Sequence, residues 1–311
     1  MRVLPFIAAC LYGVAVVQPA AAAEEQNVVL GGVAATTWSP GGNSKLPVIV
    51  FSHGFHGCPI QARTISAAIA DAGYLVIAPQ HRDGVCDENK ARLSEPPEQP
   101  WGEDQLWTDA TYRDRADDVR RVIDALRDDP EWRGRADLGR LGLMGHSLGG
   151  YTALGLAGAW PSWKLDGVKA VLGLSPVLTQ FVHHGTLPKL GAPVMYQSGT
   201  RDYRVATSLQ EPGGGYELSP APKYNIVFAN ASHRAWGEEE TAAHRVIFDY
   251  ARAFLDHYVK GDPADPVLTR REPGVAALRY DSEFGAGGDG TAVIEDPPKS
   301  LRQRAREFLG R

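Results

Sequence analysis

Short apolar runs rich in β-branched residues alternate along this chain with longer stretches in which apolar residues recur at helical spacing. The runs are bounded by glycine, proline and other turn residues, as buried strands usually are. This pattern predicts strands at residues 47–52, 74–79, 141–144, 167–174, 193–198 and 224–228. The run at 224–228 is expected to be the last strand, and a β-like segment at 28–38 comes before the first.

The stretches between these runs carry the apolar stripes that amphipathic helices present to a core. They predict helices at residues 59–72, 112–128, 148–158 and 238–260. Strands that alternate with helices form a mostly parallel sheet with helices on both faces. The chain is therefore expected to have an α/β fold.

Two regions depart from this alternation. Residues 83–110 are polar and proline-rich, and a loop of this length inside a compact domain is usually functional or mobile. From residue 262 the chain has several prolines, a glycine cluster at 285–290 and an arginine-rich amphipathic stretch at 300–309. We interpret 24–261 as one domain with 83–110 as an insertion loop, and 262–311 as a mostly extended, partly disordered C-terminal extension.

The first residues have the composition of a secretory signal peptide. A short positive start, Met1 and Arg2, precedes an apolar run at 3–17, and an A-x-A cleavage site ends at Ala23. A retained membrane anchor is disfavoured, because this run is too short to span a bilayer comfortably and no later segment is apolar for long enough. We expect removal of residues 1–23, a periplasmic or secreted protein, and no stable membrane insertion.

Removal of the first 23 residues would leave two cysteines, Cys58 and Cys86. An even number of cysteines in an exported protein suggests a disulfide, with two free thiols as the alternative. Both cysteines fall in loops after neighbouring predicted strands, which favours the bridge.

The composition excludes several classes of partner. The 311-residue chain has 43% hydrophobic residues, enough for a sizeable core, and its net charge of -5 gives no electrostatic basis for binding nucleic acid. Metal-ligand patterns of the C-x-x-C or H-E-x-x-H kind are absent from the sequence. We expect no metal and no cofactor, and a monomer, since nothing in the sequence requires an oligomer.

Residues 145–149 carry the strongest chemical signal. They fit G-x-S-x-G, the nucleophile elbow of α/β hydrolases, with Ser147 at its centre, an apolar strand before it and a helix-forming run after it. The strained turn would lift the Ser147 hydroxyl clear of the sheet and leave the Leu148 N–H at a helix N-terminus, facing a developing oxyanion. The alternative is an ordinary Gly- and Ser-rich loop.

A nucleophilic serine needs a base and an orienting acid, which in this fold class follow it in the order Ser…Asp/Glu…His. Asp202 follows the predicted strand at 193–198, and His233 follows the one at 224–228. Chemistry in open α/β sheets lies at the carboxyl ends of the strands, so we predict Ser147 as nucleophile, His233 as base and Asp202 as acid. Alternatively, Asp202 caps a helix beginning near Tyr203, and His233 is a surface residue.

Three further residues near this site have candidate roles. The second oxyanion donor should come from the loop after the strand at 47–52, where the Phe55 N–H is the candidate and its ring a candidate pocket wall. Trp236 is a candidate for substrate binding, with core packing as the equal alternative. His146 is interpreted as a packing and hydrogen-bonding residue rather than as a second base.

The chain resembles, on several blocks in the right order, platelet-activating-factor acetylhydrolases and dienelactone-hydrolase-like esterases of the α/β-hydrolase superfamily. The blocks are residues 51–55, 69–73, 74–79, 81–84 and 145–150. The resemblance covers most of 46–260 and implies an α/β-hydrolase fold. True dienelactone hydrolases use a cysteine nucleophile, where this chain has Ser147.

The later part, residues 198–202 and 232–233, is more similar to cutinase-like bacterial polyester hydrolases, whose acid follows the penultimate strand. Acetylhydrolases have their acid one strand earlier, and the corresponding residues 174–176 contain no carboxylate. This departure favours Asp202 as the acid and weakens an acetylhydrolase substrate. The Phe55 ring matches the aromatic that polyester hydrolases usually show in the oxyanion loop.

Together these features predict an exported serine hydrolase that cleaves small carboxylic esters through an acyl-enzyme. A lipase-like or polyester-degrading activity on large apolar esters is the alternative, and the polar insertion at 83–110 argues mildly against it. A non-catalytic binding protein that kept the fold is a further alternative, disfavoured because all three triad residues are present.

Overall fold

The computed structural model describes residues 22–42, 44–86, 90–237, 243–288 and 291–294. Most of the predicted signal peptide and the amphipathic stretch at 300–309 lie outside the described residues. The described strands are β1 (Glu24–Leu30), β2 (Val33–Ser39), β3 (Leu46–Ser52), β4 (Leu75–Pro79), β5 (Ala136–His146), β6 (Val168–Leu174), β7 (Val194–Gly199), β8 (Lys223–Phe228), β9 (Val275–Ser282) and β10 (Gly285–Gly288).

The described α-helices lie largely between these strands. They are α1 (Arg63–Asp71), α2 (Arg113–Asp128), α3 (Pro130–Arg135), α4 (Leu148–Leu154), α5 (Thr179–His183), α6 (Tyr203–Gln210), α7 (Gly215–Leu218) and α8 (His244–Leu255). The predicted helix at 148–158 is α4 continued by a π-helical turn, and α8 is continued in the same way by Asp256–Lys260. Residues 238–242 of the predicted last helix lie outside the described residues.

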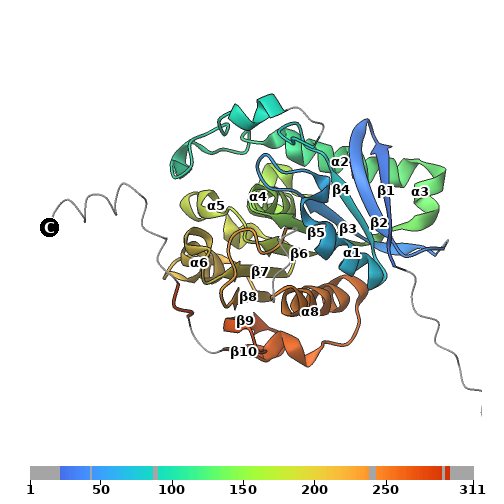
Figure 1. Ribbon diagram of the computed structural model, residues 1–311. Helices are drawn as coiled ribbons and strands as arrows, with labels where there is room; N and C mark the ends of the chain where they lie inside the picture. Colours follow the sequence, from blue (N-terminus) through green and yellow to red (C-terminus); the bar gives the residue numbers. More distant parts are fainter. Residues whose placement is uncertain (1–21, 43, 87–89, 238–242, 289–290, 295–311) are drawn as a thin grey trace, which may run out of the picture.

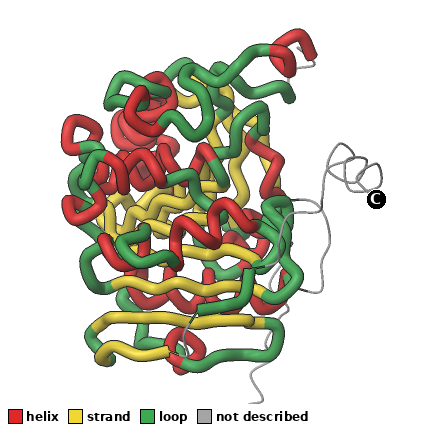
Figure 2. Tube along the Cα trace, turned by 90° about the vertical axis from the view of Figure 1, so that its left-hand side faces the viewer, coloured by secondary structure: helices red, strands yellow, loops and turns green. Residues whose placement is uncertain are grey.

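The strands form one sheet in the order β1-β2-β4-β3-β5-β6-β7-β8-β9-β10 (Figure 1). The six central strands, from β4 to β8, pair in parallel, and the outer pairings are antiparallel. Strand direction turns progressively from one edge of the sheet to the other, as the twist of a parallel sheet requires (Figure 2). The α/β-hydrolase fold class predicted from the sequence is confirmed.

Helices cover both faces of the sheet and create two hydrophobic cores. Helices α1 and α8 lie together on one face, where Ile69 and Phe254 join the inner side chains of the strands. Helices α2 and α4 cover the other face, with Val122 and Leu154 in the core. Because the central strands are buried on both faces, they read in the sequence as continuous apolar runs rather than as alternating ones.

Two strand predictions need correction. The β-like segment at 28–38 is a hairpin of β1 and β2, and it turns at Gly31 and Gly32, which both have positive φ. The strand at 224–228 is not the last, because β9 pairs antiparallel with β8 and β10 pairs with β9. The sheet therefore continues past residue 261, where the sequence suggested that the domain ends.

The described part of the insertion, residues 83–86 and 90–110, packs against the body of the molecule next to α5 (Figure 1). Its Trp107 is fully buried and contacts the Tyr151 ring of α4, with ring centroids 5.4 Å apart. The Thr179 hydroxyl donates to Asp104 at 2.9 Å, and the Trp107 carbonyl lies 2.7 Å from His184 Nε2. These contacts place the insertion over the carboxyl ends of the central strands, beside the loops that carry the predicted site.

Candidate active site

Ser147 occupies a sharp turn between β5 and α4. Its φ of 55° lies in the left-handed region, which a residue with a side chain adopts only where surrounding structure enforces it. A Cβ on Gly145 would lie 2.1 Å from the Gly149 carbonyl oxygen, and one on Gly149 would lie 1.9 Å from the Ser52 oxygen. Only glycine fits at either flank, which is the physical reason for the G-x-S-x-G spacing.

The structure brings Ser147, His233 and Asp202 together. His233 Nε2 lies 2.9 Å from the Ser147 hydroxyl oxygen, and Nδ1 lies 3.2 Å from each carboxylate oxygen of Asp202. Asp202 is buried, whereas the His233 side chain is 42% exposed. Asp202 is the residue before α6, but its side chain caps no helix N–H, so the cap alternative is wrong.

A second serine contacts the same histidine. The Ser175 hydroxyl lies 3.1 Å from His233 Nδ1. Ser175 follows β6, is fully buried and has a φ of 49°. The sequence analysis considered this position only for its missing carboxylate and did not predict its contact with the candidate base. The available signal was its place at the end of a strand next to the one that leads to Asp202.

Two backbone N–H groups next to the candidate nucleophile are free to donate. Among the described residues, neither the Leu148 N–H nor the Phe55 N–H donates a hydrogen bond. The neighbouring N–H groups of the Phe55 loop are engaged, since Gly54 donates to Gln61, His56 to the Asp83 carboxylate, and Gly57 to the Gly54 carbonyl. Among the described residues, the two predicted donors therefore remain available beside Ser147.

The comparison with protein families identifies the family of this chain. A model of the dienelactone hydrolase family matches residues 32–233, a stretch that runs from the β1–β2 turn to the candidate base. This chain belongs to the dienelactone hydrolase family. A search of the curated proteins gave no match.

This dienelactone hydrolase family member contains a second Ser–His–Asp series of hydrogen-bonded side chains, which lies inside the protein. Ser52 lies 2.8 Å from His81 Nε2, and His81 Nδ1 lies 2.9 Å from Asp118. Burial of His81, next to the Arg115 charge, holds the pKa of its imidazole well below the usual value. Ser52 is the last residue of the regular strand β3, and both Ser52 and His81 are buried, so this second Ser–His–Asp series has no route to a substrate.

His146, inside the elbow, has the structural role predicted for it. Its Nε2 lies 2.8 Å from the His233 carbonyl oxygen, and this contact joins the elbow to the loop that carries His233. Burial, together with the nearby His233, lowers the pKa of His146 to about 3. A neutral, buried imidazole at this place supports the turn rather than moving protons.

Trp236 does not reach the surface of the site. Its side chain is 2% exposed, its indole N–H donates to Gln197 at 3.0 Å, and its ring stacks near His146 with centroids 6.4 Å apart. The core alternative is therefore the one that the structure supports, and the predicted substrate contact by Trp236 is corrected. An aromatic residue in this loop gives no sequence signal that separates these two roles.

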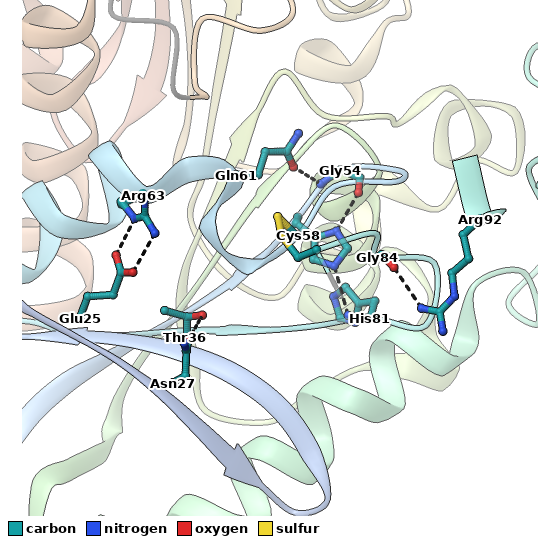
Figure 3. Close-up of a disulfide and its surroundings, with 12 residues drawn as sticks. Glu25, Asn27, Thr36, Gly54, Cys58, Gln61, Arg63, His81, Gly84 and Arg92 are labelled. Atoms are coloured by element: carbon teal, nitrogen blue, oxygen red, sulfur yellow. Dashed lines mark hydrogen bonds and ion pairs between the residues drawn. A yellow bond between two sulfur atoms is a disulfide. The ribbon is translucent and has the colours of Figure 1, made fainter. Parts of the chain in front are cut away.

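The predicted disulfide is present and lies beside the candidate oxyanion loop. Cys58 and Cys86 are bonded, with their Cα atoms 5.4 Å apart (Figure 3). The Val85 N–H donates to the Gly57 carbonyl at 3.2 Å, next to the bridge. The loops that follow β3 and β4 are thus joined both covalently and by hydrogen bonds.

Two further features concern only the part of the chain that the structure describes. No group of three or more His, Cys, Asp or Glu side chains there is arranged to hold a metal ion. None of its helices combines the length and the apolar character needed to cross a bilayer.

Proposed function

We propose that this chain is an exported serine hydrolase that cleaves carboxylic esters through an acyl-enzyme. The observation that carries the proposal is the continuous contact from Asp202 through His233 to Ser147, with the serine held in a strained elbow. A family of hydrolases, a nucleophile at a helix N-terminus and a base with a buried acid behind it all favour acyl transfer.

In the proposed mechanism, the Ser147 oxygen attacks the ester carbonyl carbon while His233 Nε2 takes the hydroxyl proton. Asp202 keeps the other proton on Nδ1 and stabilises the imidazolium that forms. The N–H groups of Leu148 and Phe55 donate to the oxyanion of the tetrahedral intermediate. His233 then gives its proton to the leaving alkoxide, and a water activated in the same way hydrolyses the acyl-enzyme.

The export part of the proposal rests on the leader-like N-terminus and the disulfide. Stable disulfides form mainly in oxidising compartments, so a bond between Cys58 and Cys86 is expected of a periplasmic or secreted protein. Fractionation of cells that express the full chain tests this directly. A protein recovered from the periplasm or medium without residues 1–23 agrees with the proposal, and a full-length cytoplasmic protein contradicts it.

A second candidate, hydrolysis of large apolar esters, is favoured by one surface feature. Trp101 of the insertion is 41% exposed and lies against Phe55, with ring centroids 5.7 Å apart. Leu106, also in the insertion, is 42% exposed. Apolar surface beside the oxyanion loop offers a long acyl chain or a polyester segment something to bind.

The first experiment is labelling with a fluorophosphonate, which reacts with activated serines, in wild type, Ser147→Ala and Ser198→Ala. Ser198 is the control because it is a fully buried serine on β7 without a described contact to the triad. Labelling that disappears only in Ser147→Ala supports the proposal. An unlabelled wild type favours the non-catalytic alternative, and labelling that survives in Ser147→Ala excludes Ser147 as the reactive serine.

The second experiment is hydrolysis of p-nitrophenyl esters from acetate to palmitate, with Ser147→Ala as background. A steep preference for short chains indicates a small-pocket esterase. Equal or higher rates on long chains support the second candidate, and Trp101→Ala should then raise KM for palmitate more than for acetate.

A further inference from the structure

Arg115 of α2 lies fully buried directly beneath the loop that carries Phe55. Its Nη1 donates to the His53 carbonyl at 2.7 Å, and its Nη2 donates to the Gly54 carbonyl at 3.2 Å. The same guanidinium forms an ion pair with Asp83, with Nη2 2.7 Å from one carboxylate oxygen and Nε 3.1 Å from the other. All of these contacts lie outside the triad, and the mechanism above does not use them.

Asp83 contacts the other side of the same loop. The Asp83 oxygen that contacts Arg115 Nη2 also accepts the His56 N–H at 3.3 Å. Burial disfavours the charged carboxylate, but the charge and hydrogen bonds of Arg115 outweigh this and lower the pKa of Asp83 to about 2. The pair therefore holds the carbonyls before Phe55 and the N–H after it.

The geometry of the peptide bond links these contacts to the oxyanion donor. The Gly54 carbonyl and the Phe55 N–H belong to one planar trans peptide, in which C=O and N–H point in opposite directions. Three donors converge on the Gly54 oxygen: His53 Nδ1 at 2.8 Å, the Gly57 N–H at 3.0 Å and Arg115. Fixing this oxygen fixes the direction of the Phe55 N–H on the opposite side of the plane.

The surrounding hydrogen bonds set the imidazole beside this peptide. The His81 N–H donates to His53 Nε2 at 3.1 Å, so His53 carries its proton on Nδ1 and donates to the Gly54 oxygen. On the far side of the loop, the Gln61 amide oxygen accepts the Gly54 N–H at 2.8 Å. The orientation of the peptide is thus determined from several directions at once.

A buried ion pair is a poor choice for stability alone, because removing two charges from water opposes much of their attraction, and apolar residues of similar size serve as well. A guanidinium, however, presents a planar fork of donors that an apolar side chain does not supply. Besides pairing with Asp83, the guanidinium donates through Nη1 and Nη2 to two carbonyls of one short loop. The chemistry of the pair therefore matches a need to orient those carbonyls.

We propose that Arg115 and Asp83 are positioning residues of the oxyanion hole, which aim the Phe55 N–H at the tetrahedral intermediate. This inference rests on the proposed function of Ser147 and Phe55. The pair touches no substrate and acts through the loop. Its effect should appear where negative charge develops on the carbonyl oxygen, and not in the binding of the ground-state ester.

The test compares wild type with Arg115→Lys and Asp83→Asn. Arg82→Lys is the matched control, because Arg82 belongs to the same loop as Asp83, pairs with Glu98 and is 74% exposed. The measurements are kcat and KM for p-nitrophenyl acetate, and inhibition by phenylboronic acid, which forms a tetrahedral adduct with a reactive serine. Thermal unfolding of each variant shows whether the fold is retained.

We expect kcat to fall about 10–100-fold in both variants, because a displaced oxyanion donor loses part of the 10²–10³-fold effect of a deleted one. KM should change less than about 3-fold, since ground-state binding is preserved. Phenylboronic acid should bind more weakly in proportion to the fall in kcat, and Arg82→Lys should match wild type.

Unchanged kcat in both folded variants, or a loss confined to KM, would overturn the inference. A fall in kcat with unaltered boronate inhibition would do the same. Should Arg115→Lys not fold, Asp83→Asn carries the test, because Asp83 contacts both Arg115 and the His56 N–H of the same loop. A wild type that hydrolyses no ester and resists fluorophosphonate would instead refute the proposed function.

Discussion

The Ser175 hydroxyl lies 3.1 Å from Nδ1 of His233, the nitrogen that also faces the carboxylate of Asp202. A base that takes a proton at Nε2 must carry its own proton on Nδ1. Asp202 is 3.2 Å from Nδ1 through both oxygens, so neither oxygen alone makes a short hydrogen bond. In the proposed mechanism, with the proton on Nδ1, the Ser175 oxygen is a further acceptor that favours this tautomer of His233 and holds its ring in place.

Ser175→Ala should therefore lower kcat/KM by about 3–10-fold, the effect of losing one hydrogen bond of about 1 kcal/mol. Ester hydrolysis measures this, and Ser198→Ala, a buried serine on the next strand, should leave the rate unchanged. An active Ser175→Ala with the wild-type rate would show that the contact does not help the base.

Asp202→Asn should lower kcat/KM by roughly 10³–10⁴-fold, because an amide favours the wrong tautomer of His233. Stability should change little, since Asp202 caps no helix N–H. Asp129→Ala is the contrast, because Asp129 does cap α3 by accepting the Glu131 N–H at 2.8 Å. That variant should lose about 1 kcal/mol in urea unfolding and keep full activity. The reverse outcome would reassign Asp202 to a structural role.

Gly149→Ala should prevent formation of the elbow. Its Cβ would lie 1.9 Å from the Ser52 carbonyl oxygen, which is backbone and does not move aside. We expect a protein that is insoluble or inactive, measured by yield and by fluorophosphonate labelling. Gly134→Ala is the matched control in α3, where a Cβ meets nothing within 4 Å. It should be neutral or stabilising by about 0.5–1 kcal/mol, as alanine favours helix.

The free energy of unfolding should fall as the pH drops below about 6.5. Burial lowers the pKa of His146 to about 3, and it holds the pKa values of His53 and His81 well below their usual value. A histidine whose folded-state pKa is depressed stabilises the fold above its unfolded pKa. That stability is lost as the pH falls toward the folded value, because only the unfolded chain takes up the proton. Each such group contributes roughly 2 kcal/mol of loss at pH 5.

Urea unfolding between pH 7 and 5 measures this slope, and His146→Gln should reduce it by about one proton. Burial raises the pKa of the Asp118 carboxyl, so Asp118 changes the free energy of unfolding with pH in the opposite direction. The informative quantity is therefore the difference in slope between wild type and His146→Gln. Equal slopes for wild type and His146→Gln would contradict the assignment of a neutral His146.

Reduction of the Cys58–Cys86 bridge should lower the free energy of unfolding by about 3–4 kcal/mol. The bridge closes a loop between residues that are 28 positions apart in the sequence, and this restricts the unfolded chain. Unfolding with and without dithiothreitol gives the value. The double variant Cys58→Ser/Cys86→Ser should be destabilised equally and should not respond to the reductant. A response of the double variant would point to a different effect of the reagent.

The sequence was informative wherever a local pattern reflects a local physical requirement. The buried strands, the elbow and the order of Ser147, Asp202 and His233 all follow from such patterns. The strand β9 was missed because residues 275–282 alternate weakly, and β10 consists of glycine and alanine without strand preference.

Contacts between distant residues could not be predicted in this way. Arg115 lies in an amphipathic helix, where a charged residue is normally interpreted as solvent-exposed, yet it is completely buried 61 residues from Gly54 in sequence. Ser175 likewise contacts a histidine 58 residues away. Each of these roles depends on the three-dimensional register of the sheet, which no local pattern contains.

Because β9 pairs with β8, the C-terminal region helps to hold the strand that leads to His233, a role that its composition does not indicate. Strand β8 leads into the loop of His233, and the Ala229 N–H just after it donates to the Gly274 carbonyl at 2.8 Å. A chain shortened at residue 261 would leave the main-chain groups of β8 unpaired along an open edge, where copies could join edge to edge. We therefore expect a chain that ends at residue 261 to lose the main-chain contacts that hold the strand leading to His233.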